Sequence, residues 1–377
     1  MSRQAFVREV NRIEFTNKWL WRWLRPVVGG QLARRCRHCV IPESYRAIGA
    51  DGLCDACRQP VAEAAVPQPA ADSGQFDQLL QSFAGRGPGQ HDALVLISGG
   101  KDSSLLLHRL RSDYPGLRLI SLLVDNGFMS PIALDNAARV RSRFDVDHLT
   151  YRLNAGFVAK GFRFVLTHLE RQRGYSMVDM LDGTLTFDTA RTLASQMRLP
   201  LIICGLSAVQ SETLFAARLQ ELPPGEEVRA FERLAQTPLP EIYDEDEMER
   251  FWDPANYPAS EPPRFMMPMV VWDLDETHIL AEVERLGLLQ ADRTRPLLTN
   301  NALIPLIAIA EISQFGYTSF EVEFAEMIRR GKSDRTYWRN LFEMAEYSAK
   351  TGSFLSASTL ETLSALGLTK ADVGLKN

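Results

Sequence analysis

The stretch Ala93-Leu-Val-Leu-Ile-Ser-Gly-Gly-Lys-Asp-Ser-Ser-Leu-Leu-Leu-His-Arg-Leu110 decides the fold of this chain. Residues 93–97 form a continuous apolar run of strand length, and residues 105–110 have the apolar spacing of a helix. The residues between them are rich in glycine and serine, which is typical of a turn. The order strand, glycine turn and helix predicts one unit of an α/β sheet.

Strand and helix patterns continue to alternate on the C-terminal side of this unit. Further strands are expected at 117–124, 145–151 and 201–204, and further helices at 132–144 and 189–197. This alternation predicts an α/β fold with a doubly wound parallel sheet, whose ligands bind at the carboxyl ends of the strands.

The turn at 98–104 has the composition of a phosphate-binding loop. Two glycines let the backbone approach an anion, and the helix that follows presents unpaired N–H groups and a positive dipole end. The expected phosphate ligands are Ser98, Gly99, Gly100, Ser103 and Ser104. Lys101 would supply a positive charge to the bound phosphates, and Asp102 fits this loop if it holds Mg²⁺ bridged to the same phosphates. The spacing differs from both Gly-x4-Gly-Lys-Ser/Thr and Gly-x-Gly-x-x-Gly.

Four of the five cysteines lie close together, as two Cys-x2-Cys pairs: Cys36, Cys39, Cys54 and Cys57. Two such pairs place four thiolates around a tetrahedral Zn²⁺, and with no open ligand position the ion would be structural. A redox pair or an iron–sulfur site is the alternative, while disulfides are disfavoured in a reducing compartment. The fifth cysteine, Cys204, lies in an apolar strand pattern and is expected to be a buried strand residue.

Composition bounds the rest of the chain. It has 377 residues, 45% of them hydrophobic, and a net charge of −5, which is typical of a globular protein of two or three domains. The absence of a long apolar run or a secretory signal favours a cytoplasmic location, and the acidic balance argues against a nucleic-acid partner. Six segments are expected: a basic Trp-rich extension (1–35), a four-cysteine zinc module (36–60), a linker and helix (61–90), a phosphate-binding α/β domain (91–216), an acidic insertion or lid (217–270) and a helical C-terminal region (271–377).

The N-terminal extension carries Trp19, Trp21 and Trp23 in a segment with helical spacing. Such an aromatic, arginine-bearing helix is suited to a peripheral membrane contact, and the competing interpretation is a helix packed on the protein's own core.

Ser98-Gly-Gly-Lys-Asp-Ser103 resembles the signature of the PP-loop ATP pyrophosphatase superfamily, whose fold is that of the adenine nucleotide alpha hydrolases. The resemblance covers roughly residues 91–210 and implies an enzyme that binds ATP and adenylates its substrate. Leu123-Val-Asp-Asn-Gly127 resembles the end of that superfamily's second strand, which implies that Asp125 and Asn126 face the adenosine. Leu201-Ile-Ile-Cys-Gly-Leu-Ser207 resembles a strand that ends in glycine, which places Gly205 at the nucleotide.

The four-cysteine module before this loop looks like the start of the N-acetyl sugar amidotransferases of lipopolysaccharide and nonulosonic acid biosynthesis. Cys36-Arg-His-Cys-Val-Ile-Pro42 and Gly52-Leu-Cys-Asp-Ala-Cys57 carry this resemblance. It implies that ATP adenylates an acetamido group on a free or nucleotide-linked sugar, and that ammonia from a separate glutaminase replaces the oxygen, releasing AMP and pyrophosphate. Asp182 and Thr184, expected in a loop before a helix, are weaker candidates for the substrate side, and a turn with a helix cap is the alternative.

Two other functions are open. A PP-loop sulfur transferase acting on tRNA or a small molecule would use Cys204, the one cysteine outside the module, but such enzymes generally need more cysteines in the PP-loop domain. The third candidate function is a zinc-bearing nucleotide sensor without enzymatic activity. It would keep the phosphate loop but would not need Lys101 together with Asp102.

Overall fold

The structure is a computed structural model, and it describes residues 3–59, 73–257, 261–289, 301–353 and 355–375. Its centre is a five-stranded sheet with the strand order β3-β2-β1-β4-β5, in which all neighbouring strands are parallel. The strands are β1 (Ala93–Leu96), β2 (Leu119–Asp125), β3 (Asp147–Arg152), β4 (Leu201–Ile203) and β5 (Arg264–Met266). The predicted doubly wound parallel sheet is therefore confirmed.

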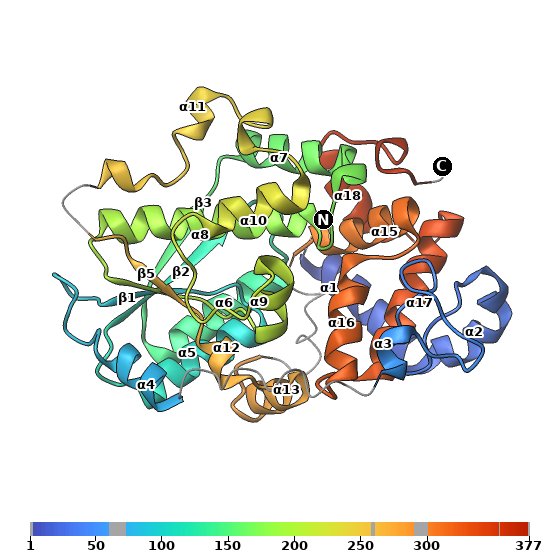
Figure 1. Ribbon diagram of the computed structural model, residues 1–377, viewed down its shortest axis with the longest axis horizontal. Coiled ribbons are helices and arrows are strands. Elements are labelled where there is room, and N and C mark those ends of the chain that lie inside the picture. The colour runs from blue at the N-terminus through green and yellow to red at the C-terminus, as the bar shows by residue number, and fades with distance from the viewer. Residues whose placement is uncertain (1–2, 60–72, 258–260, 290–300, 354, 376–377) are drawn as a thin grey trace.

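Helices cover both faces of this sheet (Figure 1). Alternate residues of β1 supply the two cores: Leu94 and Leu96 belong to one cluster, and Ala93 and Val95 belong to the other. The first cluster includes α7 (Ala155–Thr167), α8 (Met177–Gln196) and α10 (Glu226–Ala235). The second includes α4 (Ser73–Gln81), α5 (Lys101–Asp113), α12 (Pro268–Trp272) and α13 (Glu276–Arg285). The helix α6 (Pro131–Phe144) follows β2, and α9 (Ala208–Phe215) follows β4.

Three features of the α/β layers differ from the sequence-based expectations. The helix α7 was not predicted, and α8 begins at Met177 rather than at residue 189, so Asp182 and Thr184 lie inside a helix and the predicted loop is wrong. Residues 217–270 contribute β5, which pairs with β4, so the expected insertion is part of the sheet layers. Its acidic run forms the short helix α11 (Glu245–Met248), where Lys160 of α7 pairs with Glu247.

The C-terminal region is helical, as predicted. Its helices are α15 (Leu303–Phe315), α16 (Ser319–Arg329), α17 (Arg335–Thr351) and α18 (Ala357–Ala365). They lie beside the α/β layers, and α16 runs between these layers and the helices α2 and α3 (Figure 1). Of the predicted linker and helix at 61–90, residues 61–72 lie outside the described residues, and the helix is α4.

The N-terminal segment to residue 31 forms α1 (Arg3–Phe15), a π-helical turn at Thr16–Leu20, α2 (Trp21–Val28) and a short 3₁₀ turn at Gly29–Gln31. The four-cysteine module follows and includes the short helix α3 (Asp55–Arg58). Arg35, at the entrance to this module, is buried between Glu321 of α16 and Glu346 of α17 and pairs with both. This pairing fixes the module to the C-terminal helices.

Within the described residues, no single helix has the length and hydropathy needed to cross a bilayer. Among the described helices, the required length and hydropathy are met only by α15 and α16 taken together, and the chain bends by 98° between these two helices.

Candidate nucleotide site and four-cysteine centre

The turn after β1 lies at the point where the strand order reverses. The chain runs from β1 to β2 and β3 on one side and returns to β4 on the other, so the loops after β1 and β4 diverge at this edge of the sheet. Such a topological switch point is where doubly wound sheets bind their ligands. The predicted phosphate loop is therefore at the position that the fold favours for a nucleotide.

Gly99 is required by the geometry of this turn. Its φ of +74° lies in the left-handed region, and a Cβ built there would lie 2.0 Å from the carbonyl oxygen of Ala133 in α6. Asn136 of the same helix donates from Nδ2 to the Gly99 carbonyl at 3.1 Å and is buried. The loop is thus held directly against α6, and Asn136 is a positioning residue that sequence reasoning missed.

The predicted serine ligands have two different environments. Ser98 is exposed, and its hydroxyl lies 3.2 Å from the hydroxyl of Ser103. Ser104 is buried and donates to the Gly100 carbonyl at 2.7 Å, a bond that closes the first turn of α5. In this structure Ser98 is open to a ligand, whereas Ser104 stabilises the loop.

Lys101 and Asp102 begin α5 and line a cavity of about 150 Å³. The Lys101 ammonium lies 2.7 Å from the Asp102 carboxylate. Burial lowers the pKa of Lys101, but the neighbouring carboxylates of Asp102 and Glu276 outweigh it and raise the pKa above its usual value. Lys101 is therefore cationic at neutral pH, as the predicted role requires. The carboxylate of Asp102 is of the kind that Mg²⁺ prefers.

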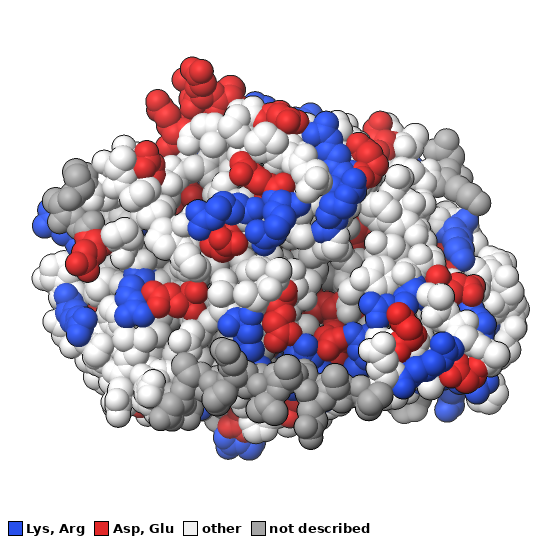
Figure 2. Space-filling view, viewed as in Figure 1, with Lys and Arg blue, Asp and Glu red and all other residues white. Residues whose placement is uncertain are grey.

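The far wall of the cavity is acidic. Tyr175 donates to Asp179 at 2.7 Å and lies 3.3 Å from Glu323 of α16. Burial raises the pKa of Asp179, and burial together with the charge of Asp179 raises the pKa of Glu323 to about 7. Figure 2 shows acidic side chains in a hollow between the α/β layers and the C-terminal helices. The cavity therefore combines a cationic lysine with two carboxyl groups, Asp179 and Glu323, whose pKa values are both raised.

The predicted adenosine contacts lie at the end of β2. Asp125 accepts from the Gly127 N–H at 2.8 Å. Asn126 is buried and donates to Asp182 at 2.6 Å, and Asn301 donates to the other carboxylate oxygen of Asp182 at 3.3 Å. Burial raises the pKa of Asp182 to about 7. The structure thus joins Asp182 to the predicted adenosine residue Asn126, while Thr184 is fully buried and donates to backbone carbonyls of Met180 and Glu227.

Cys204 and Gly205 follow directly on β4. Cys204 is 3% exposed, and burial raises the pKa of its thiol to about 12. A thiolate is the nucleophilic form of cysteine, so this environment keeps Cys204 unreactive. A Cβ at Gly205 would lie 3.4 Å from the backbone of Ser103, so this residue packs against the start of α5.

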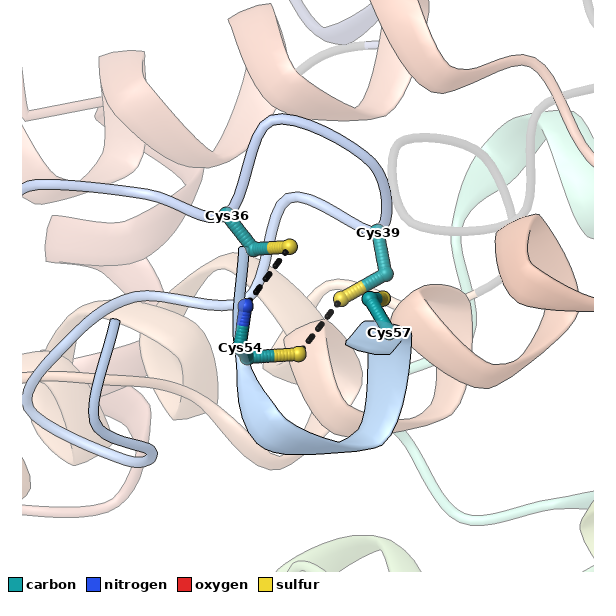
Figure 3. A group of neighbouring side chains, drawn as sticks. All are labelled: Cys36, Cys39, Cys54 and Cys57. Carbon is teal, nitrogen blue, oxygen red and sulfur yellow. Dashed lines mark hydrogen bonds between the residues drawn. The ribbon is translucent and has the colours of Figure 1, made fainter. Parts of the chain in front are cut away.

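The four clustered cysteines come together as predicted (Figure 3). Their sulfur atoms all lie within 4.8 Å of one another, and those of Cys39 and Cys54 are 3.7 Å apart. Four Zn–S bonds of ~2.3 Å in a tetrahedron place sulfurs ~3.8 Å apart, so the donor set fits one Zn²⁺. In a four-iron cluster each thiolate binds a different iron, which requires a wider spacing.

The four-cysteine centre and the cavity share one helix. The cysteines Cys36, Cys39 and Cys54 pack against Ala325 of α16, and Glu323 of the same helix lines the cavity. Phe320, Phe324 and Met327 complete that wall. The acidic wall was not predicted, because no sequence motif connects Asp179 of α8 or Glu323 of α16 with the loop at 98–104.

The fold and the site define a class: a doubly wound α/β protein with a glycine-serine loop at the switch point and a four-cysteine module packed on its C-terminal helices. No family model and no curated protein matches the sequence.

Solved structures with some likeness to the chain include three enzymes. The U34-tRNA thiolase NcsA from Methanococcus maripaludis, solved with its [4Fe-4S] cluster, is 13% identical, with a TM-score of 0.35 over 92% of this chain and 98% of the thiolase. The NMN synthetase from Francisella tularensis is 11% identical, with a TM-score of 0.35 over 76% and 99%. The NH3-dependent NAD synthetase from Campylobacter jejuni is 12% identical, with a TM-score of 0.29 over 48% and 87%.

Proposed function

We propose that this protein is an ATP-dependent amidotransferase that converts an acetamido group on a sugar into an acetamidino group. The observation that carries the proposal is the cavity in which the buried Lys101, at the head of α5, faces the carboxyl groups of Asp179 and Glu323. A cation beside a phosphate loop suits pyrophosphate departure, and nearby proton acceptors suit an amine nucleophile.

The proposed reaction has two steps. The acetamido oxygen attacks the α-phosphorus of ATP, forming an O-adenylated imidate and releasing pyrophosphate. The nitrogen of ammonia then attacks the imidate carbon, AMP leaves with the oxygen, and the acetamidino group remains. The adenylation converts a poor leaving oxygen into a good one, so the second step needs no further activation.

The residues have separate roles in this proposal. Ser98, Gly99, Gly100 and the start of α5 bind the phosphates, and Lys101 neutralises charge on the departing pyrophosphate. Asp102 would hold Mg²⁺, which supplies further neutralisation of the phosphates when it is bound.

The acidic wall supports ammonia as the nucleophile. Ammonia is present at neutral pH mainly as ammonium, which cannot attack a carbon until it loses a proton. Glu323, whose pKa is raised to about 7, is a suitable acceptor for that proton, and a carboxylate also attracts the ammonium cation. Glu323 and Asp179 therefore form the proposed ammonium subsite.

Sulfur transfer through Cys204 is the less favoured function. A persulfide carrier must be reached by a sulfur donor, but Cys204 is 3% exposed and its pKa is raised to about 12. The other cysteines are spaced for a metal ion.

The proposal also concerns partners and location. The acceptor is a free or nucleotide-linked acetamido sugar of the lipopolysaccharide or nonulosonic acid type, and a separate glutaminase supplies the ammonia. A cytoplasmic site of action is part of the proposal, because the reaction would consume ATP and the four cysteines would have to stay reduced to hold a metal ion.

The test is a release assay with the full chain, MgATP, ammonium chloride and a panel of acetamido sugars. We expect AMP and pyrophosphate to appear in equal amounts only when sugar and ammonium are both present, and ¹⁵N-ammonium to label the product. Lys101→Met should abolish release, because it removes the proposed catalytic cation. Cys204→Ala should leave release unchanged, because Cys204 is buried and has no role in the proposed reaction.

Two outcomes would overturn the proposal. One is pyrophosphate release that depends on a sulfide donor and disappears in Cys204→Ala. The other is ATP cleavage that no acetamido sugar in the panel stimulates while another carbonyl substrate does.

A further inference from the structure

Six large apolar side chains are exposed along one short segment of the N-terminal helices. Ten large hydrophobic residues are exposed in the described chain, and six of them fall between residues 15 and 27: Phe15, Trp19, Leu20, Trp23, Leu24 and Val27. Trp19 is 59% exposed and Trp23 is 69% exposed. All six belong to one uninterrupted helical run, in which Phe15, Trp19, Trp23 and Val27 recur at intervals of four residues, as do Leu20 and Leu24. We refer to these six residues as the Trp face.

The opposite side of the same helices is fixed to the protein. Trp21 is buried and donates from its indole nitrogen to Glu343 of α17 at 2.9 Å. Asn340 of α17 donates to the Asn17 carbonyl at 3.1 Å, and the Asn17 side chain donates to the Tyr337 carbonyl at 3.3 Å. These polar contacts explain why one tryptophan of the three is internal. The six residues of the Trp face stay exposed, and α2, which carries three of them, lies at the edge of the molecule beside α17 (Figure 1).

Every exposed charged side chain between residues 12 and 27 is basic. Four basic residues of the segment are exposed, and Glu14 is the single acidic residue between positions 12 and 27. Glu14 is buried, where it accepts a hydrogen bond from Tyr337 and pairs with Lys18. The Arg22 guanidinium lies 5.1 Å from the ring centre of Trp23, so cation and aromatic ring face solvent together. The four basic residues are Arg12, Lys18, Arg22 and Arg25, the last of which also pairs with Glu343.

We propose that the Trp face docks this protein on an anionic lipid bilayer. Tryptophan and leucine side chains on one helix face insert into the interface between head groups and acyl chains, and tryptophan favours that depth. Arg12 and Arg22 add cationic charge to this segment, while Lys18 pairs with Glu14 and Arg25 with Glu343, and each cation near an anionic surface adds to binding. The Trp face and the excess of positive charge occur on the same helical segment, which is the combination that a peripheral membrane helix needs. The mode is surface attachment, because no single helix in the described residues has the length and hydropathy to cross a bilayer.

The test is vesicle flotation with the full chain. We expect binding to vesicles of phosphatidylcholine mixed with phosphatidylglycerol, weaker binding to phosphatidylcholine alone, and loss of the difference at high salt. The double variant Trp19→Glu/Trp23→Glu should reduce the vesicle-bound fraction about tenfold or more. Leu134→Glu/Leu360→Glu, which places the same charges at exposed apolar positions on α6 and α18, is the matched control and should float like the wild type.

Circular dichroism of both variants checks that they are folded, and fluorescence of the exposed tryptophans should shift to shorter wavelength with anionic vesicles and by less with phosphatidylcholine alone. The proposal is overturned if the wild type stays unbound on anionic vesicles at low salt, or if both double variants bind equally. It is also overturned if sedimentation finds a dimer that Trp19→Glu/Trp23→Glu abolishes and that does not bind vesicles, since a second copy would then cover the Trp face.

Discussion

Replacing Gly99 by alanine tests the candidate nucleotide loop at its most constrained point. The new Cβ would lie 2.0 Å from the Ala133 carbonyl oxygen, whereas real Cβ contacts do not fall below 3.0 Å. The loop and α6 must therefore separate by about 1 Å. The left-handed φ of +74° adds about 1 kcal/mol, and the forced separation adds about 1–3 kcal/mol, so we expect a loss of about 2–4 kcal/mol in unfolding free energy.

The effect on function should be larger than the effect on stability. A shift of about 1 Å in groups that hold a reacting phosphate costs roughly 100-fold in rate. We therefore expect Gly99→Ala to bind MgATP weakly in calorimetry and to release AMP about 100-fold more slowly, while the melting temperature falls by several degrees.

Gly287→Ala is the matched control. Gly287 has a φ of +62°, and no atom lies within 4 Å of the position that a methyl group would take there. Gly287→Ala therefore has the cost of a left-handed φ but no clash with a neighbouring residue. If Gly99→Ala melts and binds ATP as Gly287→Ala does, the contact with α6 does not define the loop and the reasoning is wrong.

Other variants test the rest of the site. The wild type should contain one zinc per chain, and a chelator or the variant Cys36→Ser should remove it. Loss of the metal should also speed hydrogen exchange in α16, because the module packs on Ala325. Unchanged exchange would show that the four-cysteine centre does not affect the cavity through α16. Glu323 has a folded pKa of about 7, above its ordinary 4.5, so its contribution to stability is full below pH 4.5 and is lost as pH rises through 7. In Glu323→Gln, the fall in unfolding free energy between pH 4.5 and pH 7, measured by urea unfolding, should be smaller by about 3 kcal/mol. The same variant should slow ammonium-dependent turnover. If the variant and the wild type have the same pH profile, Glu323 neither affects stability in this way nor accepts the proton. Asn136→Ala, which removes the bond to the loop, should weaken ATP binding without changing the zinc content, and normal ATP affinity would show that the bond is dispensable.

The sequence predicted the features that depend on local pattern. The apolar run before Gly99 predicted β1, the following periodicity predicted α5, and the paired Cys-x2-Cys spacing predicted a four-sulfur cluster. In each case the signal is carried by residues close in sequence, where strand length, helix period and ligand spacing act directly. The helices from 303 onward were predictable for the same reason.

Prediction from sequence was wrong where tertiary contacts override local pattern. The residues Met180-Leu-Asp-Gly-Thr184 were expected in a loop because glycine disfavours a helix, yet they lie in α8, which is buried between the sheet and α10. The three-residue strand β5 has too little pattern of its own and exists because it pairs with β4. These elements are stabilised by burial and pairing, which the chain gains only when it folds.

What the sequence by itself determined is the loop at 98–104, the alternation around it and the cysteine ligands, because each is a short contiguous motif. Only the tertiary structure decided which residues line the cavity with Lys101. These are Tyr175 and Asp179 near the start of α8 and Glu323 on α16, which lie more than seventy residues away in the chain. Their raised pKa values come from burial at that meeting point, a property that no residue has before folding. The same holds for the three tryptophans, since only packing against α17 turns Trp21 inward and leaves Trp19 and Trp23 exposed.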